Sequence, residues 1–148
     1  AHAETGGCMV AAMEVAPKRT SSYGILDIDQ DNGAIVKVKG MVEKPKAGDA
    51  PSNLAVIGRY ILTPKVLTNL NKIKQGAGGE IQLTDAIAQE TKKPGGVFGL
   101  RFRGQRYDCG SKIGFLQATV AFGLSRPEFG EEFSDFLHEL TAMQKAAQ

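Results

Sequence analysis

Two apolar-rich runs between Tyr23 and Pro45 are separated by Gln30-Asp31-Asn32-Gly33. An Asn-Gly pair can supply the positive φ angles of a tight turn, and apolar runs on both sides of such a pair are typical of a β-hairpin. The stretch therefore predicts two antiparallel strands, of which the second ends at Glu43-Lys44. A β-sheet is thus the first constraint on the fold of this chain.

Three aspartates precede the predicted turn, at Asp27, Asp29 and Asp31, and resemble the alternating acidic positions of a calcium-binding loop. The sixth position of that loop is a glycine and the twelfth is a glutamate that binds with both oxygens. Asn32 and Val38 stand at those positions here. The acidic residues are therefore better explained by turn chemistry than by calcium binding.

Other apolar patterns predict strands before and between helices. Three runs bounded by glycine or proline are typical of strands, at residues 8–15, 53–62 and 97–104. The last run alternates, which predicts Phe98, Leu100 and Phe102 on one face. Helical spacing of apolar residues predicts helices within residues 63–73, 76–93, 113–124 and 133–143. The first of these starts with Thr63 as a predicted N-cap and Pro64 as the first helical residue. The pattern indicates an α/β or α+β fold with a mixed β-sheet and flanking helices, and we expect the α/β class.

The size and charge of the chain exclude several classes of protein. Its 148 residues suit a single domain over 1–148, and a net charge of +2 without a basic cluster argues against nucleic-acid binding. No apolar run approaches the ~20 residues of a membrane helix. Cys8 and Cys109 lie far apart without metal-ligand spacing, so we expect no zinc site or disulfide framework and a cytoplasmic location.

The end of the predicted hairpin carries two opposite charges, Glu43 and Lys44, followed by Pro45. Open α/β sheets bind ligands at the carboxyl ends of their strands. A carboxylate accepts hydrogen bonds from sugar hydroxyls, and an ammonium neutralises a phosphate, so the pair suits a sugar phosphate. The alternative is a solvated strand end at which proline turns the chain.

A second candidate site follows the predicted strand 97–104, in the sequence Tyr107-Asp108-Cys109-Gly110. Asp108 can be a Mg²⁺ ligand if other oxygens complete the shell. Equally, Asp108 or Ser111 can cap the helix that begins near Ile113. A cysteine-histidine mechanism is disfavoured, because the two histidines lie near the start of the chain and in the last predicted helix. Gly24, at the start of a strand, permits close approach of a ligand to the backbone.

The chain resembles the C-terminal half of the bacterial UTP–glucose-1-phosphate uridylyltransferase family in six ordered motifs: TGGCMVA, YGILD, VEKP, NLAVIGRYIL, GGEIQLTDAI and YDCGSKIGFLQATVAFGL. The resemblance implies a partial Rossmann-like nucleotidyltransferase fold. It also implies an enzyme that forms UDP-glucose and pyrophosphate from UTP and glucose 1-phosphate with Mg²⁺.

The same resemblance implies roles for individual residues. It implies that Gly24 offers its backbone to the sugar, that Glu43 holds glucose hydroxyls and that Lys44 contacts the phosphate and offsets charge in catalysis. Gly58 and Tyr60 are implied to belong to the strand beside the sugar pocket. Asp108 is implied to be one of two carboxylates that bind the catalytic Mg²⁺.

The family's Gly-rich UTP-binding loop and its second carboxylate have no counterpart in these 148 residues. We therefore expect a fragment that is inactive alone and whose truncated sheet exposes an edge that favours homo-oligomers. Two alternatives remain open. One is a related enzyme that uses dTTP or another sugar 1-phosphate, and the other is a non-catalytic module for sugar-nucleotide binding or assembly.

Overall fold

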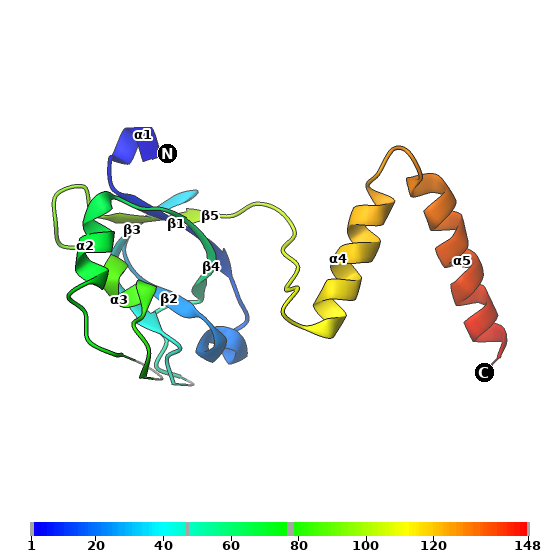
Figure 1. Ribbon diagram of the computed structural model, residues 1–148, viewed down its shortest axis with the longest axis horizontal. Helices are drawn as coiled ribbons and strands as arrows, with labels where there is room; N and C mark the ends of the chain where they lie inside the picture. The colour runs from blue at the N-terminus through cyan, green and yellow to red at the C-terminus, as the bar shows by residue number, and fades with distance from the viewer. Residues whose placement is uncertain (1, 47, 77–78, 148) are drawn as a thin grey trace. The chain divides into compact units, whose positions relative to one another are not determined.

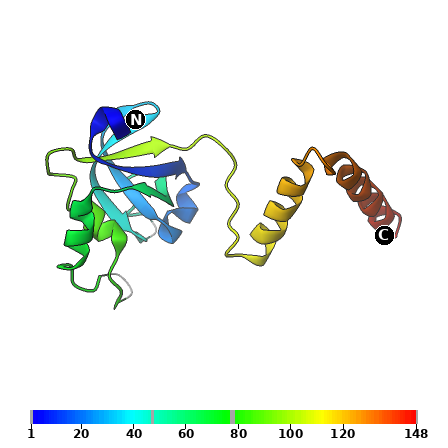
Figure 2. The same ribbon diagram turned by 45° about the horizontal axis from the view of Figure 1, so that its top comes forward.

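A computed structural model describes residues 2–46, 48–76 and 79–147, and the chain divides into two compact units. Residues 1–103 form the first unit and residues 104–148 form the second. The first unit is a β-sheet with short helices beside it, and the second is a pair of helices (Figures 1 and 2). The expectation that residues 1–148 belong to a single domain stays a prediction.

Five strands form one mixed sheet in the first unit: β1 (Cys8–Glu14), β2 (Gly24–Asn32), β3 (Ile35–Glu43), β4 (Leu54–Ile61) and β5 (Val97–Arg101). They lie in the order β1-β4-β2-β3-β5, and β5 pairs again with β1. Among these described strands, only the β1–β5 pairing is parallel. The predicted mixed sheet with flanking helices is confirmed. The predicted open edge is wrong, because each of these described strands has a partner on both sides.

The hairpin between β2 and β3 turns at Gly33 and Ala34, since Asn32 already pairs with Ile35. Gly33 has a φ of +77°, whereas Asn32 does not have a positive φ. A glycine with positive φ at the first central position is typical of a two-residue hairpin loop. The turn therefore lies one residue later than the Asn-Gly pair predicts.

An ion pair ties this turn to the end of β5. The Arg101 guanidinium donates to both carboxylate oxygens of Asp31, at 2.7 and 2.6 Å, and also to the Gly33 carbonyl. The hydrogen bonds from Arg101 and from the Gly33 N–H lower the pKa of Asp31 to about 2. The remaining acidic residues of the strand pair with lysines of β3: Asp27 with Lys39 at 3.4 Å and Asp29 with Lys37 at 3.7 Å. The three aspartates thus serve the hairpin, as the sequence indicates.

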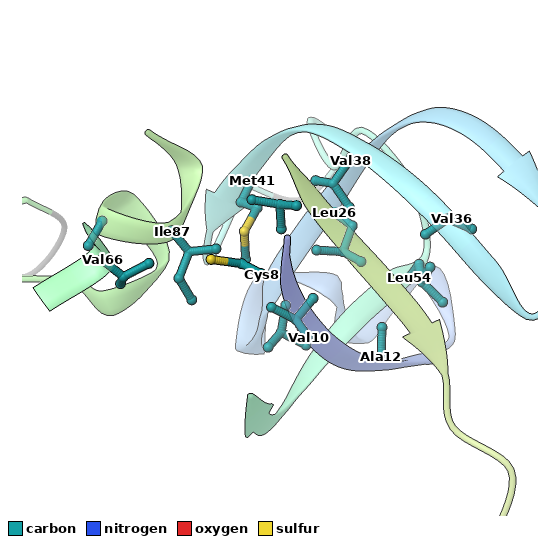
Figure 3. Close-up of a cluster of buried hydrophobic side chains, with 13 residues drawn as sticks. Cys8, Val10, Ala12, Leu26, Val36, Val38, Met41, Leu54, Val66 and Ile87 are labelled. Atoms are coloured by element: carbon teal, nitrogen blue, oxygen red, sulfur yellow. The ribbon is translucent and has the colours of Figure 1, made fainter. Parts of the chain in front are cut away.

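The core lies between the strands and two helices, where buried aliphatic side chains form one cluster (Figure 3). The sheet contributes Val10 and Leu26 among others, and Val66 and Ile87 reach the cluster from the helices. Each such side chain contributes about 1.5–3 kcal/mol when it is fully removed from water. This cluster is the main source of stability in the first unit.

The residues of β5 that face the core are not the apolar residues that the alternating pattern groups on one face. Val97 and Gly99 are buried, whereas Phe98 and Leu100 are only half-buried and Phe102 is exposed. The predicted alternation is present, and the face that carries Phe98, Leu100 and Phe102 is the less buried one. A Cβ on Gly99 would lie 2.6 Å from Leu26 Cδ1 and 2.8 Å from Val36 Cγ2, so glycine is the residue that fits inside the closed sheet.

Four short helical segments accompany the sheet: α1 (His2–Thr5), η1 (Pro17–Ser22), α2 (Pro64–Leu70) and α3 (Leu83–Ala88). Thr63 is the N-cap residue of α2 and Pro64 is its first helical residue, which confirms the predicted start. Helix α3 is shorter than the predicted segment 76–93. It packs against β3 through its buried Ala86 and Ile87.

A buried polar cluster joins α2 to the end of α3. The side-chain amide of Asn69 donates to the Ala86 carbonyl at 3.2 Å and to Glu90 Oε1 at 2.6 Å. Lys93 donates to the same carboxylate oxygen at 2.7 Å. Burial raises the pKa of Glu90, but the hydrogen bonds from Lys93 and Asn69 outweigh it, so the net shift is downward. The cluster fixes the end of α3 against α2.

The second unit contains α4 (Lys112–Leu124) and α5 (Gly130–Ala146). The two helices approach closely at Gly123, where a Cβ would lie 2.7 Å from the Phe133 ring. Much of the predicted apolar face is exposed on both helices, including Ile113, Leu116 and Phe136. No helix in the described part of the chain is long and apolar enough to cross a membrane.

Replacing Gly99 with alanine is expected to lower the free energy of unfolding by about 1–3 kcal/mol, because the new methyl group overpacks the core. Gly40→Ala is the matched control, since a Cβ there would meet Asp27 at an ordinary 3.6 Å. Urea unfolding of both variants gives the comparison. Equal stabilities would show that Leu26 and Val36 do not close against Gly99.

Candidate functional site

The candidate site is built around the last residue of β3, Glu43. The antiparallel register pairs Glu43 with Gly24, the first residue of β2. A Cβ on Gly24 would lie only 2.9 Å from Glu43 Oε2. The absence of a side chain at Gly24 therefore leaves room for the carboxylate beside the strand.

Helix α3 brings a hydroxyl group to the same carboxylate. Thr84 is 8 % exposed, and its Oγ1 donates to Glu43 Oε2 at 2.7 Å. The sequence does not single out Thr84, because the helical spacing of apolar residues is carried by its neighbours Leu83 and Ile87. One sequence feature does indicate that Thr84 is buried. It lies three residues before Ile87, and therefore on the same side of the helix.

These residues line a pocket with a volume of about 270 Å³. Its walls come from the end of η1, the starts of β2 and α3, the end of β3 and the strand β4: Ser22, Tyr23, Gly24, Glu43, Val56, Tyr60, Gln82, Leu83 and Thr84. Burial, and then the charge of Glu43, raise the pKa of Tyr60. The phenol is therefore protonated at neutral pH, and the pocket combines a carboxylate acceptor with hydroxyl groups. That combination suits a ligand with several hydroxyls.

Lys44 follows Glu43 in a conformation that ends the strand. Its φ is +45°, and among the described residues it is the one non-glycine with positive φ. Its N–H donates to the Tyr23 carbonyl at 3.0 Å, which anchors the turn beside the pocket. The alternation that sends adjacent strand side chains to opposite faces therefore does not extend to Lys44. The side chain is exposed and does not line the pocket.

Gly58 lies in an irregular part of β4 and has a φ of +74°. In the register with β1, Val56 pairs with Ala12 and Tyr60 with Val10, so three residues of β4 oppose one residue of β1. Such a bulge changes the direction of the following side chains. Gly58 thus belongs to the strand beside the pocket, and Tyr60 rather than Gly58 lines it.

Asp108 belongs to the second unit, where it is exposed just before α4. Its Oδ1 accepts from the Gly110 N–H at 3.1 Å, and Ser111 caps the helix by accepting from the Gly114 N–H at 3.1 Å. The N-cap is therefore Ser111, which leaves Asp108 able to offer an oxygen to a cation. No group of three His, Cys, Asp or Glu residues suited to a metal occurs in the described part of the chain. Asp108 as a Mg²⁺ ligand stays a prediction.

Comparison with known proteins defines the class of this fold. The model of the nucleotidyl transferase family matches residues 1–122, and the chain belongs to that family. Similar curated proteins within it are named UTP–glucose-1-phosphate uridylyltransferase. The one from Komagataeibacter xylinus is 56% identical over 112 residues, and that from Staphylococcus epidermidis strain RP62A is 42% identical over 137. The resemblance seen in the sequence motifs is confirmed.

These alignments cover 74% and 93% of this chain but 38% and 47% of the two relatives, so the chain spans less than half of their length. A crystal structure of UDP-glucose pyrophosphorylase complexed with UDP-glucose matches with a TM-score of 0.78 at 42% identity, over 84% of this chain and 47% of that one. The Acinetobacter baumannii enzyme matches with a TM-score of 0.80 at 37% identity, over 94% and 47%. The predicted nucleotidyltransferase fold is confirmed.

The left-handed conformation of Lys44 predicts that the protein is more stable with glycine than with alanine at this position. An L-residue with a side chain pays about 1–2 kcal/mol in this region, so Lys44→Gly is expected to be about 1 kcal/mol more stable than Lys44→Ala. Lys37, in the middle of β3, provides the control, since glycine there is expected to be less stable than alanine. Urea unfolding of the four variants measures both differences. The same sign at both positions would contradict the backbone conformation of Lys44.

Proposed function

We propose that this chain supplies the sugar-phosphate-binding part of a UTP–glucose-1-phosphate uridylyltransferase, which forms UDP-glucose and pyrophosphate from UTP and glucose 1-phosphate. The observation that carries the proposal is the pocket at the end of β3, in which Glu43, Tyr60 and Gly24 converge. The names of the similar curated proteins support the choice of substrates.

The pocket groups suit a hexose. The Glu43 carboxylate accepts hydrogen bonds from sugar hydroxyls, and the protonated Tyr60 phenol can donate one. The backbone at Gly24 is accessible to the ligand because no side chain covers it. Gly58 contributes through the bulge in β4 that precedes Tyr60. Together these groups would hold the sugar ring, and Lys44 beside them would neutralise the phosphate on it.

In the proposed reaction, a phosphate oxygen of glucose 1-phosphate attacks the α-phosphorus of UTP in line and pyrophosphate leaves. The protein residues position the reactants and offset negative charge, and no protein nucleophile is needed. Lys44 is the proposed catalytic cation. Mg²⁺, when bound, would supply further neutralisation of phosphate charge, with Asp108 as one of its oxygen ligands.

A related specificity is the second candidate. A structure described as a putative glucose-1-phosphate thymidylyltransferase from Bacillus anthracis matches with a TM-score of 0.59 at 27% identity, over 78% of this chain. Both the TM-score and the identity are lower than those of the match to UDP-glucose pyrophosphorylase. This difference favours the uridylyl reaction over one with dTTP. A non-catalytic module for sugar-nucleotide binding or assembly is the alternative from a different class.

Several expectations about the setting of the protein remain predictions. A cytoplasmic location is consistent with two free cysteines, Cys8 and Cys109. Small-molecule substrates, without nucleic acid or membrane as partners, fit the even distribution of charge. Homo-oligomers would cover apolar side chains that are exposed on α4 and α5, such as Phe122 and Met143.

Removing the Glu43 carboxylate tests the proposed pocket. Glu43→Ala is expected to weaken binding of UDP-glucose by at least about tenfold, because a charged acceptor of hydrogen bonds is lost. Isothermal titration calorimetry, with and without Mg²⁺, measures the change. Glu14→Ala is the matched control, since Glu14 also ends a strand but is 75% exposed and lies outside the pocket. Absence of any UDP-glucose binding by the unmodified chain would leave only an assembly role.

The 148-residue chain alone is expected to release no pyrophosphate above background from UTP and glucose 1-phosphate. Its residues include neither a Gly-rich triphosphate-binding loop nor the second predicted carboxylate, and catalysis by positioning and charge stabilisation needs both. A coupled pyrophosphate assay, with a full-length relative as positive control, makes the measurement. Turnover near that of the relative would contradict the prediction.

A further inference from the structure

The hydrogen bond between Thr84 and Glu43 joins two elements that are far apart in the sequence. Glu43 ends β3 and Thr84 lies in the first turn of α3, and their side chains meet at 2.7 Å. The donor is Thr84 Oγ1, because an ionised carboxylate can only accept. The bond therefore fixes Oε2 of the carboxylate at one side of the pocket.

The surroundings of this bond are tightly defined. A Cβ on Gly24 would lie 2.9 Å from Glu43 Oε2 and 3.4 Å from Thr84 Oγ1. The strand β2 thus passes directly beside the two oxygen atoms and limits how far the carboxylate can move. In the described part of the chain, Thr84 provides the one side-chain hydrogen bond found to the Glu43 carboxylate, and it reaches Oε2, so Oε1 is available to a ligand.

The donor is itself held in place by the packing of α3. Ala86 and Ile87 are fully buried, and the Asn69 amide donates to the Ala86 carbonyl at 3.2 Å. Thr84 is 8 % exposed and therefore has little freedom to turn to another partner. A hydroxyl that is fixed in this way restricts the orientation of the carboxylate that it contacts.

We propose that Thr84 is a positioning residue, which directs the Glu43 carboxylate so that Oε2 is held by the protein and Oε1 accepts from a hydroxyl of the sugar. The inference rests on the proposed function, because it assigns Glu43 to the sugar. It predicts that loss of the Thr84 hydroxyl weakens sugar binding because the Glu43 carboxylate is no longer held in place. Thr84 itself does not contact the ligand.

The test compares Thr84→Val, which keeps the shape but removes the donor, with Thr84→Ser, which keeps the donor. Calorimetry with UDP-glucose is expected to show about tenfold weaker binding for Thr84→Val and binding within about threefold of the unmodified chain for Thr84→Ser. Thr91→Val is the matched control, since its hydroxyl donates to the Ala88 carbonyl away from the pocket. Thermal unfolding of all variants shows whether each is folded.

The same substitution in a Glu43→Ala background distinguishes positioning from direct contact. Thr84→Val is expected to have no further effect there, because the carboxylate that it positions is gone. An equal loss in both backgrounds would overturn the inference in favour of a direct contact. Unchanged binding by Thr84→Val, with weak binding by Glu43→Ala, would overturn the inference and leave the proposed function intact.

A nuclear magnetic resonance measurement tests the hydrogen bond without a ligand. The carboxyl ¹³C shift of Glu43 is expected to change in Thr84→Val and to remain close to its original value in Thr84→Ser. An unchanged shift in both variants would overturn the inference. If UDP-glucose binds normally to Glu43→Ala, or does not bind the unmodified chain, the proposed function fails and the inference fails with it.

Discussion

The pairing of Gly24 with Glu43 is the constraint on which the candidate site depends. A slip of one residue in the β2–β3 register would turn every side chain of one strand to the opposite face, and it would place a residue with a Cβ against the carboxylate. The glycine turn at Gly33 helps to fix this register, because it sets where β2 turns into β3. The bidentate pair between Arg101 and Asp31 ties the same turn to β5.

The candidate site also requires that α3 stays packed against the sheet. Buried side chains of the helix join the core cluster, and the Asn69–Glu90–Lys93 cluster holds its carboxyl end. This helix carries one wall of the pocket, so the same contacts that stabilise the first unit also determine where the pocket groups meet. Because Asn69 and Glu90 are buried and their hydrogen bonds are satisfied, loss of one partner would leave an unpaired polar group inside.

The sequence alone predicts those features that depend on local pattern. The hairpin, the start of α2 at Thr63-Pro64 and the cap of α4 within 108–111 follow from residue types with short-range preferences. The Asn-Gly pair predicts the turn one residue too early, because the positive φ is needed at Gly33 and not at Asn32. Local pattern does not indicate which face of β5 is buried, because Gly99 has no side chain to mark it as apolar and the closure of the sheet depends on pairings between distant strands. The contact of Thr84 is equally absent from local pattern, since its partner Glu43 lies 41 residues away.

The backbone of Lys44 bears on how the adjacent charges of Glu43 and Lys44 are arranged. In a regular strand the two side chains would point to opposite faces, and one ligand could use both only by wrapping around the strand end. A positive φ at Lys44 ends this alternation directly after Glu43. Glycine would adopt this conformation at lower cost, but it would provide no ammonium group. Strain of about 1–2 kcal/mol at a residue with a side chain is a feature that clusters at functional sites. The strained backbone of Lys44 and the pocket at Glu43 lie at the same end of β3, which supports the proposed ligand-binding role of this strand end.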